Sequence, residues 1–137
     1  MKNSQSIFIF LIPFFISSCS NKNFKEHPII TAEKDIFNLG RIHKNDSVRL
    51  SFKIYNTGGD TLKVLNYGGG CGCTDIEVGK TKIFSGDSSS VNILYLPNQD
   101  IDSVYKSIVL ETNAIERYKV IRLKAYVDTA ANQDKIY

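Results

Sequence analysis

The chain has 137 residues and a formal net charge of +3, with acidic and basic residues spread along its length. This length suits one domain with a two-layer core but not two domains. The charge pattern contains no basic stripe, so nucleic acid is excluded as an expected partner. Helical periodicity is nearly absent, and most of the tyrosines fall within strand-like runs.

The N-terminus has the layout of a bacterial export signal. Lys2 precedes an apolar run at residues 7–16, and two serines and Cys19 follow it. The run is too short for a comfortable transmembrane helix, which takes about 20 residues, and Pro13 interrupts it. A cysteine directly after small residues predicts a lipoprotein signal, in which residues 1–18 are removed and Cys19 carries the lipid. An ordinary cleaved signal with an incidental cysteine is the alternative.

The remainder of the chain divides into three predicted parts. Residues 19–31 are the lipidated cysteine and a polar tether, residues 32–127 are the domain, and residues 128–137 are a flexible tail. Loss of Lys2 with the signal lowers the net charge to about +2. Several acyl chains anchor a protein more firmly than one. We therefore expect it in the cell envelope, lipid-anchored to the inner or outer membrane, on the periplasmic side or at the cell surface.

Residues 47–55 give the clearest strand signal. Val48, Leu50, Phe52 and Ile54 alternate with residues suited to a wet face, so one side of this strand is apolar. About seven strands without helices between them predict an all-β, immunoglobulin-like antiparallel β-sandwich. Similar short runs separated by turn residues predict the other strands at 35–42, 61–67, 81–84, 90–96, 104–111 and 117–127.

Four short motifs occur together in the predicted domain. They are the opening at 37–42 (FNLGRI), the strand and turn at 52–58 (FKIYNTG), the CGCT motif at 71–74, and the turn Ser85-Gly86-Asp87 where Pro-Gly-Glu is usual. Together they resemble the bacterial family called domain of unknown function 1573, over roughly residues 32–127. The resemblance implies an Ig-like module on an exported protein or lipoprotein, distantly similar to Ig-like domains of ciliary and centrosomal scaffold proteins. It implies no settled activity.

Cys71 and Cys73 form the one reactive-looking constellation in the sequence. With Cys19 lipidated, they are left as an isolated pair in an oxidising compartment. One interpretation is a redox disulfide, because a bridge across a single residue closes a tight, labile ring. A second is Cu(I) binding by two thiolates, although such sites normally need more ligands and only His27 and His43 offer imidazoles. The third is a structural staple, or two packed thiols, without chemistry.

No pattern in the sequence predicts catalysis. His43 lies beside a turn and is expected to be exposed, not to act as a base for a nucleophile. Asp75 and Glu77 would share a strand face. Solvent there would keep their two pKa values similar, whereas acid–base catalysis needs them separated. The glycines at 68–70 lack the lysine and the helix of a phosphate loop. We therefore predict a protein that is not an enzyme and holds no cofactor.

Four triplets have the form Asp, then Ser or Thr, then an apolar residue. Some bacteria use this triplet for O-glycosylation of exported proteins, and the candidate hydroxyls here are Ser47, Thr61, Ser103 and Thr129. The competing structural interpretation is that Asp ends a turn and the hydroxyl residue opens the next strand. Both interpretations stay open on the sequence.

The sequence thus predicts a lipid-anchored envelope module that acts by binding or scaffolding. Its expected contacts are the membrane, through the lipid on Cys19, and an unknown envelope protein or glycan. Exposed strand edges and end loops are its natural contact surfaces. The alternative function is thiol–disulfide exchange or Cu(I) handling by the loop at 71–73.

Overall fold

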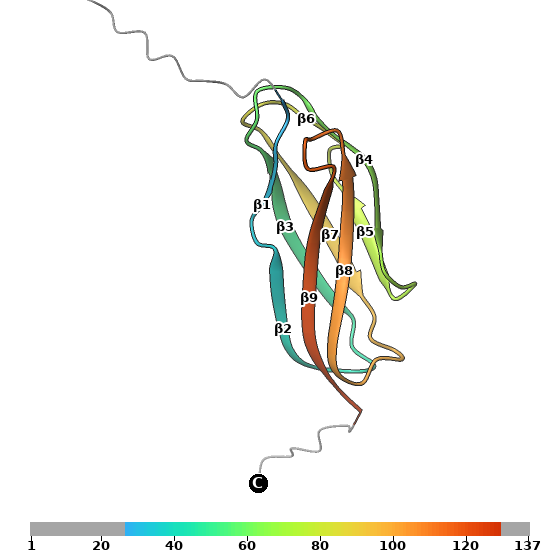
Figure 1. Ribbon diagram of the computed structural model, residues 1–137. Coiled ribbons are helices and arrows are strands. Elements are labelled where there is room, and N and C mark those ends of the chain that lie inside the picture. The colour runs from blue at the N-terminus through green and yellow to red at the C-terminus, as the bar shows by residue number, and fades with distance from the viewer. Residues whose placement is uncertain (1–26, 130–137) are drawn as a thin grey trace, which may run out of the picture.

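A computed structural model describes residues 27–129 as nine strands in two packed sheets, which confirms the all-β sandwich (Figure 1). Within this range no apolar helix long enough to cross a membrane is present. The first sheet has the order β1 (Ile30–Ala32), β3 (Val48–Asn56), β7 (Ser88–Tyr95), β5 (Thr74–Val78). The second has the order β2 (Ile36–His43), β9 (Tyr118–Asp128), β8 (Asp102–Thr112), β4 (Leu62–Gly69), β6 (Lys82–Ile83).

Alternating side chains from both sheets meet in one apolar core. Phe37 of the second sheet packs its ring 4.9 Å from that of Phe52 in the first. Since every second residue of a strand points to the same face, the apolar positions predicted from alternation are the buried ones. The most completely enclosed apolar residues are Ile54, Leu62, Ile83, Val91, Tyr95, Ile108, Leu110, Ile121, Leu123 and Val127.

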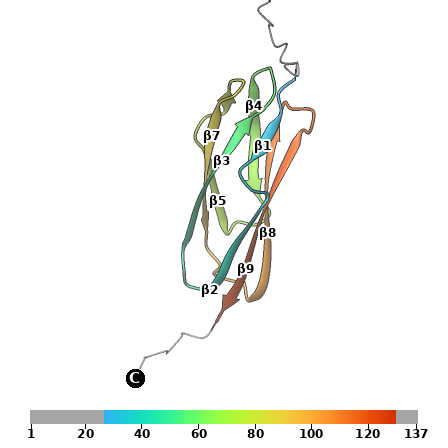
Figure 2. The same ribbon diagram turned by 90° about the vertical axis from the view of Figure 1, so that its left-hand side faces the viewer.

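The first extended segment passes from one sheet to the other. The Glu33 N–H donates to Lys53 O in β3 at 2.9 Å, and two residues later Asp35 O accepts from Arg122 N–H in β9 at 2.8 Å. Figure 2 shows β1 and β2 following one another along this side of the sandwich. A bulge at Gly40, whose φ is +72°, adjusts the register of β2 on β9. This switch covers one lateral side of both sheets.

The strand pattern differs from the prediction in three respects. The pairing of β2 with β9 is parallel, not antiparallel, because β2 continues the direction of β1 when it joins the second sheet. The prediction of about seven strands did not include β5, which is only five residues long and follows the cysteine loop, although it placed Asp75 and Glu77 on one strand face. It also placed the start of β1 in the tether, although Ile30 is buried in the core.

Strand ends differ as well. β4 continues to Gly69, so the glycines at 68 and 69 lie within the strand and do not break it. β9 continues to Asp128, one residue into the predicted tail. The extension of β4 through Gly68 and Gly69 is possible because this part of the strand lies at the edge of the sheet. Glycines at these positions would weaken a central strand.

The predicted turn at 85–87 is present. The Asp87 N–H donates to Phe84 O at 3.0 Å, and Gly86 has a φ of +79°, a conformation that favours glycine. The Ser85 hydroxyl donates to Gly58 O at 2.6 Å. The serine that replaces the usual proline therefore ties this turn to the turn between β3 and β4.

Asn56 holds one end of the sandwich together. Its side chain is buried and uses its whole hydrogen-bonding capacity. The amide donates to Asp60 O at 2.7 Å and Ile83 O at 2.9 Å, while its oxygen accepts from the N–H groups of Ile29 and Gly58. One residue thus joins the entry to β1, the β3–β4 turn and the end of β6.

We predict that Asn56→Ala strongly destabilises the domain. The change leaves four buried or half-buried backbone groups without a partner and lowers the free energy of unfolding by about 3 kcal/mol. Asn45→Ala is the matched control, because Asn45 is exposed and only its backbone N–H is hydrogen-bonded. Denaturant unfolding measures both variants, and equal stabilities would contradict the assignment.

Candidate functional site

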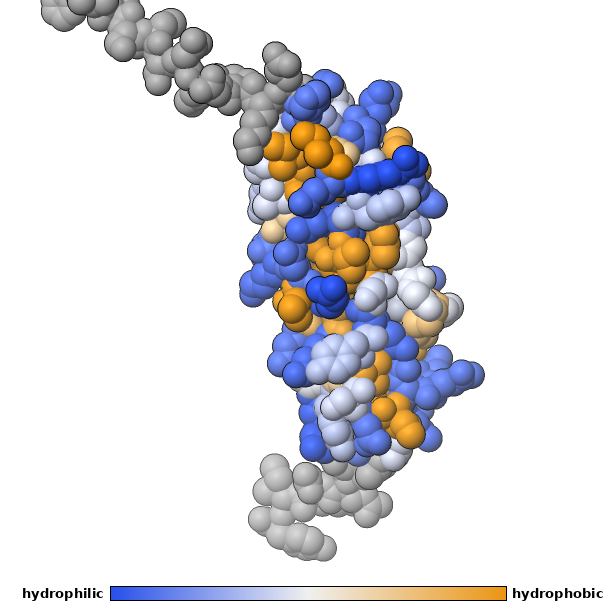
Figure 3. Space-filling view, viewed as in Figure 1, coloured by the Kyte–Doolittle hydropathy of each residue, from blue (hydrophilic) through white to orange (hydrophobic). Residues whose placement is uncertain are grey.

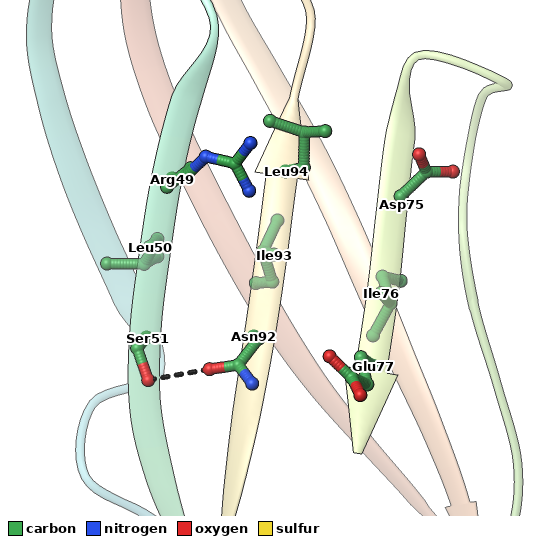
Figure 4. A pocket seen from close by; sticks show the side chains of 9 residues that line it. All are labelled: Arg49, Leu50, Ser51, Asp75, Ile76, Glu77, Asn92, Ile93 and Leu94. Carbon is green, nitrogen blue, oxygen red and sulfur yellow. Dashed lines mark hydrogen bonds between the residues drawn. The ribbon is translucent and has the colours of Figure 1, made fainter. Parts of the chain in front are cut away.

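A shallow trough crosses the outer face of the first sheet (Figure 4). It has a volume of about 470 Å³ and lies over β3, β7 and β5. Strand register sets its floor and walls. One row across the three strands consists of Arg49, Leu94 and Asp75. The next row consists of Ser51, Asn92 and Glu77. Six outward side chains from three strands therefore line it in two rows.

The charges of the trough are separated by strand. Arg49 lies on β3, and Asp75 and Glu77 lie on β5, with the uncharged β7 between them. All three charged residues are exposed, and for the two acids this agrees with the prediction. On the floor the Ser51 hydroxyl donates to the Asn92 side-chain oxygen at 2.8 Å, which leaves the Asn92 amide protons facing the trough.

Cys71 and Cys73 are joined in a disulfide between β4 and β5. Both residues are half-buried, and with Gly72 they line a second cavity of about 350 Å³. The loop is held in place by the Leu96 N–H, which donates to Cys73 O at 2.9 Å. A bridge over so short a loop adds little stability through chain entropy. The pair is therefore accessible from a cavity and is not needed as a major staple.

Asp100 closes the same cavity and links the two sheets. Its carboxylate accepts from the Tyr95 hydroxyl of β7 and from the Lys106 ammonium of β8, both at 2.7 Å. Burial alone would raise the pKa of Asp100, but hydrogen bonds from Lys106 and Tyr95, with the Lys106 charge, hold it below its usual value. Burial, and then the bond to Asp100, raise the pKa of Tyr95. This network gives the inward-pointing Lys106 a carboxylate partner.

The possible metal ligands are dispersed, and in the part of the chain that the structure describes no three His, Cys, Asp or Glu side chains come together as ligands. His43, expected to be exposed, is instead half-buried at the end of β2, where its Nδ1 accepts from the Asn45 N–H. It lies at the β2–β3 turn and does not line the disulfide cavity. A Cu(I) ion at Cys71 and Cys73 would have only those two sulfur ligands.

The lateral side opposite the β1–β2 segment is open. β5 pairs only with β7, and β6 covers β4 only at Leu62 and Lys63. Within the described residues, positions 65–69 of β4 thus have no strand on their outer side. Leu65 sits at a bulge and is 56% exposed, and Tyr67 is 39% exposed. Figure 1 shows β4 along this edge of the molecule.

The outer face of the second sheet mixes apolar and charged side chains (Figure 3). Three of its tyrosines each lie close to a cation, an arrangement that satisfies both groups. The pairs are Arg41 over Tyr126 at 4.5 Å, Lys124 over Tyr105 at 5.7 Å, and Arg117 over Tyr118 at 5.8 Å. These cations are engaged with the protein's own rings, unlike the charges of the trough.

The remaining sequence candidates are scattered. Ser47, Ser103 and Thr129 are exposed and Thr61 is half-buried, at separate turns and strand starts. Their O-glycosylation stays a prediction. Cys19, the signal and residues 20–26 of the predicted tether lie outside the described residues, as does the tail beyond residue 129.

The comparison with protein families decides the classification. A model of the family described as "Protein of unknown function (DUF1573)" matches residues 30–127. The chain belongs to this family. The match confirms the resemblance drawn from the four motifs and begins at β1, two residues before the predicted domain boundary. No curated protein sequence matches this DUF1573 member.

Solved structures of distant sequence share its fold. A protein of unknown function from Porphyromonas gingivalis W83 has a TM-score of 0.67 at 15% identity, covering 78% of this chain and 51% of that one. The VesB protease of Vibrio cholerae has a TM-score of 0.56 at 17% identity, covering 75% and 32%. A PapD-like domain of human CEP192 has a TM-score of 0.55 at 10% identity, covering 95% and 98%. The DUF1573 chain thus spans half of the first protein and a third of the second, and these likenesses show the fold alone.

Sequence reasoning missed two groups of residues. The trough was missed because alternation shows which residues face outward but not which strands are neighbours. The network at Asp100 was missed because Asp100 lies in a loop, and because Lys106 had been assigned to neither the inner nor the outer face of its strand. The available signal was the alternation at 104–110, which places Lys106 on the same inward face as Ile108 and Leu110. A lysine on that face needs an acidic partner.

We predict that Asp100→Asn removes a stabilisation that depends on pH. The folded-state pKa of Asp100 lies below the ordinary value of 3.8, so its contribution is full above about pH 4 and is lost as the pH falls through the folded value. The stability gap between wild type and variant should therefore shrink in acid, as measured by denaturant unfolding across pH. Asp75→Asn, at an exposed site, is the control. A gap independent of pH would contradict the network.

Proposed function

We propose that this protein is a non-catalytic binding module, held at the cell envelope by a lipid on Cys19, that adds a partner's extended segment to β4. The observation that carries the proposal is the open outer edge at residues 65–69, where Leu65 and Tyr67 are exposed and, among the described residues, no strand pairs with the outer side of β4. Edge strands with exposed apolar side chains are the natural template for strand addition. The partner is an envelope protein, because strand addition pairs one peptide backbone with another.

The end of the domain where the described chain begins supports the membrane anchor. The Gly59 N–H donates to His27 O at 3.2 Å, so the chain enters at the β3–β4 turn. The loops beside it carry the two most exposed large apolar side chains in the described range, Phe84 at 66% and Ile115 at 75%. A short tether from Cys19 would hold this end near the lipid, where such side chains are favourable.

The anchor is tested by Cys19→Ala in the natural host. We expect the wild type in the membrane fraction, with a mass lacking residues 1–18, and the variant in the soluble exported fraction. Cys71→Ala is the control and should stay with the membrane. A Cys19→Ala protein that remains membrane-bound, or a wild type that keeps residues 1–18, would overturn the anchor.

Strand addition is tested by a photo-crosslinking residue at position 65 in living cells. We expect a crosslinked partner at position 65 that is lost when Tyr67→Lys is added, because a charge at the edge opposes strand pairing. Ile101 is 60% exposed at the other end of the sandwich, and a crosslinker there is the matched control. Equal capture at 65 and 101, or capture unaffected by Tyr67→Lys, would count against the proposal.

The cavity beside the disulfide favours a second candidate, thiol–disulfide exchange. A thiolate of a dithiol partner attacks one sulfur of the Cys71–Cys73 bond, which breaks, and a mixed disulfide forms. The partner's second thiol then attacks the partner's sulfur in the mixed disulfide and releases the protein's cysteine. The partner leaves with a disulfide, and Cys71 and Cys73 have taken up two electrons and two protons. The half-buried sulfurs at the cavity make this attack sterically feasible.

Native-state reduction tests the second candidate. We expect dithiothreitol to reduce the pair in the folded protein within minutes, with little loss of thermal stability because the closed loop is short. Alkylation with mass analysis measures the thiols, and thermal unfolding measures stability. Cys71→Ser with Cys73→Ser should match the reduced protein. Reduction that needs a denaturant would exclude exchange.

A further inference from the structure

The trough on the first sheet has one basic and one acidic wall. β3 contributes Arg49, while β5 contributes Asp75 and Glu77. The middle strand β7 presents only uncharged groups between them, Leu94 and Asn92. Two strand spacings, about 9.5 Å, separate the walls at the backbone.

None of these charges is neutralised within the described chain. The ion pairs there involve other residues, and none of 4.0 Å or less joins Arg49 to a carboxylate or Asp75 or Glu77 to a cation. Figure 4 shows the Arg49 guanidinium pointing toward β7, with Asp75 and Glu77 on the far side of that strand. Opposite charges thus face one another across a gap that the protein leaves open.

We propose that the trough binds a peptide of two or three residues with free termini, lying across the strands. Its carboxylate pairs with the Arg49 guanidinium, and its ammonium group pairs with Asp75 and Glu77. At about 3.3 Å per residue, such a peptide spans the distance between the two walls. The Asn92 amide donates to a peptide carbonyl, and Leu94 contacts a small side chain.

The charge pattern favours this occupant over others. A simple anion or cation would use one wall and meet the wrong charge on the other. A sugar would find no aromatic side chain among the lining residues. A long peptide passing through the trough would bring neither terminal charge to the walls. This site is separate from β4 and does not depend on the anchor or on strand addition.

A titration of the purified full-length protein with trialanine, followed by NMR chemical shifts, tests the proposal. Exposed ion pairs are weak, so we expect a dissociation constant that is roughly millimolar, with shifts confined to β3, β5 and β7. Trialanine amide and N-acetyl-trialanine, each lacking one terminal charge, should bind about three- to fivefold more weakly. Equal affinity for all three peptides, or shifts elsewhere, would overturn the assignment.

Two variants assign the walls. Arg49→Gln should bind trialanine as weakly as wild type binds the amide, and should not distinguish the two peptides. Glu77→Gln should narrow the distinction between trialanine and its N-acetyl form, and adding Asp75→Asn to it should abolish that distinction. Arg122→Gln, on the outer face of the other sheet, should behave as wild type. Because Arg49 and Glu77 are exposed, the same spectra verify folding, and an Arg49→Gln protein that still prefers the free carboxylate would refute the proposal.

Discussion

The switch of the first extended segment between the two sheets is the constraint on which the rest of the molecule depends. Every buried backbone group needs a hydrogen-bond partner, and β1 and β2 supply them to β3 and β9 in turn. The transfer takes place between Glu33 and Asp35. Because one segment serves both sheets, it seals one lateral side of the sandwich, and Asn56 fixes the end at which that segment enters.

Sealing one side leaves the contact surfaces of the molecule elsewhere. The opposite side ends in the short edges of β4 and β5, joined by the cysteine loop. Asp100, which lines the same cavity as the disulfide, ties the two sheets together, so the disulfide does not have to. The outer face of the first sheet keeps its opposite charges apart, whereas the outer face of the second pairs cations with tyrosines. The two faces are thus chemically distinct.

Much of this fold could be predicted from local patterns. Alternation at 48–54 and 121–127 identified the buried face of each strand, because the period of two is a local property. The parallel pairing of β2 with β9 could not be predicted, since it depends on which distant strands become neighbours. β5 was missed because five residues carry too little pattern. The trough needed the register of three strands, and only its acidic pair, Asp75 and Glu77, was visible in the sequence.

Hydrogen exchange at the outer edge of β4 is the most direct test of the central claim that this edge receives a partner strand. Among residues 65–69, the backbone amides that point away from β8 should exchange rapidly in the purified protein and become protected when the protein is in its native envelope. Amides of β2, whose segment seals the other side, should be equally protected in both. Rapid exchange at 65–69 in the envelope, with new protection elsewhere on the domain, would contradict the account.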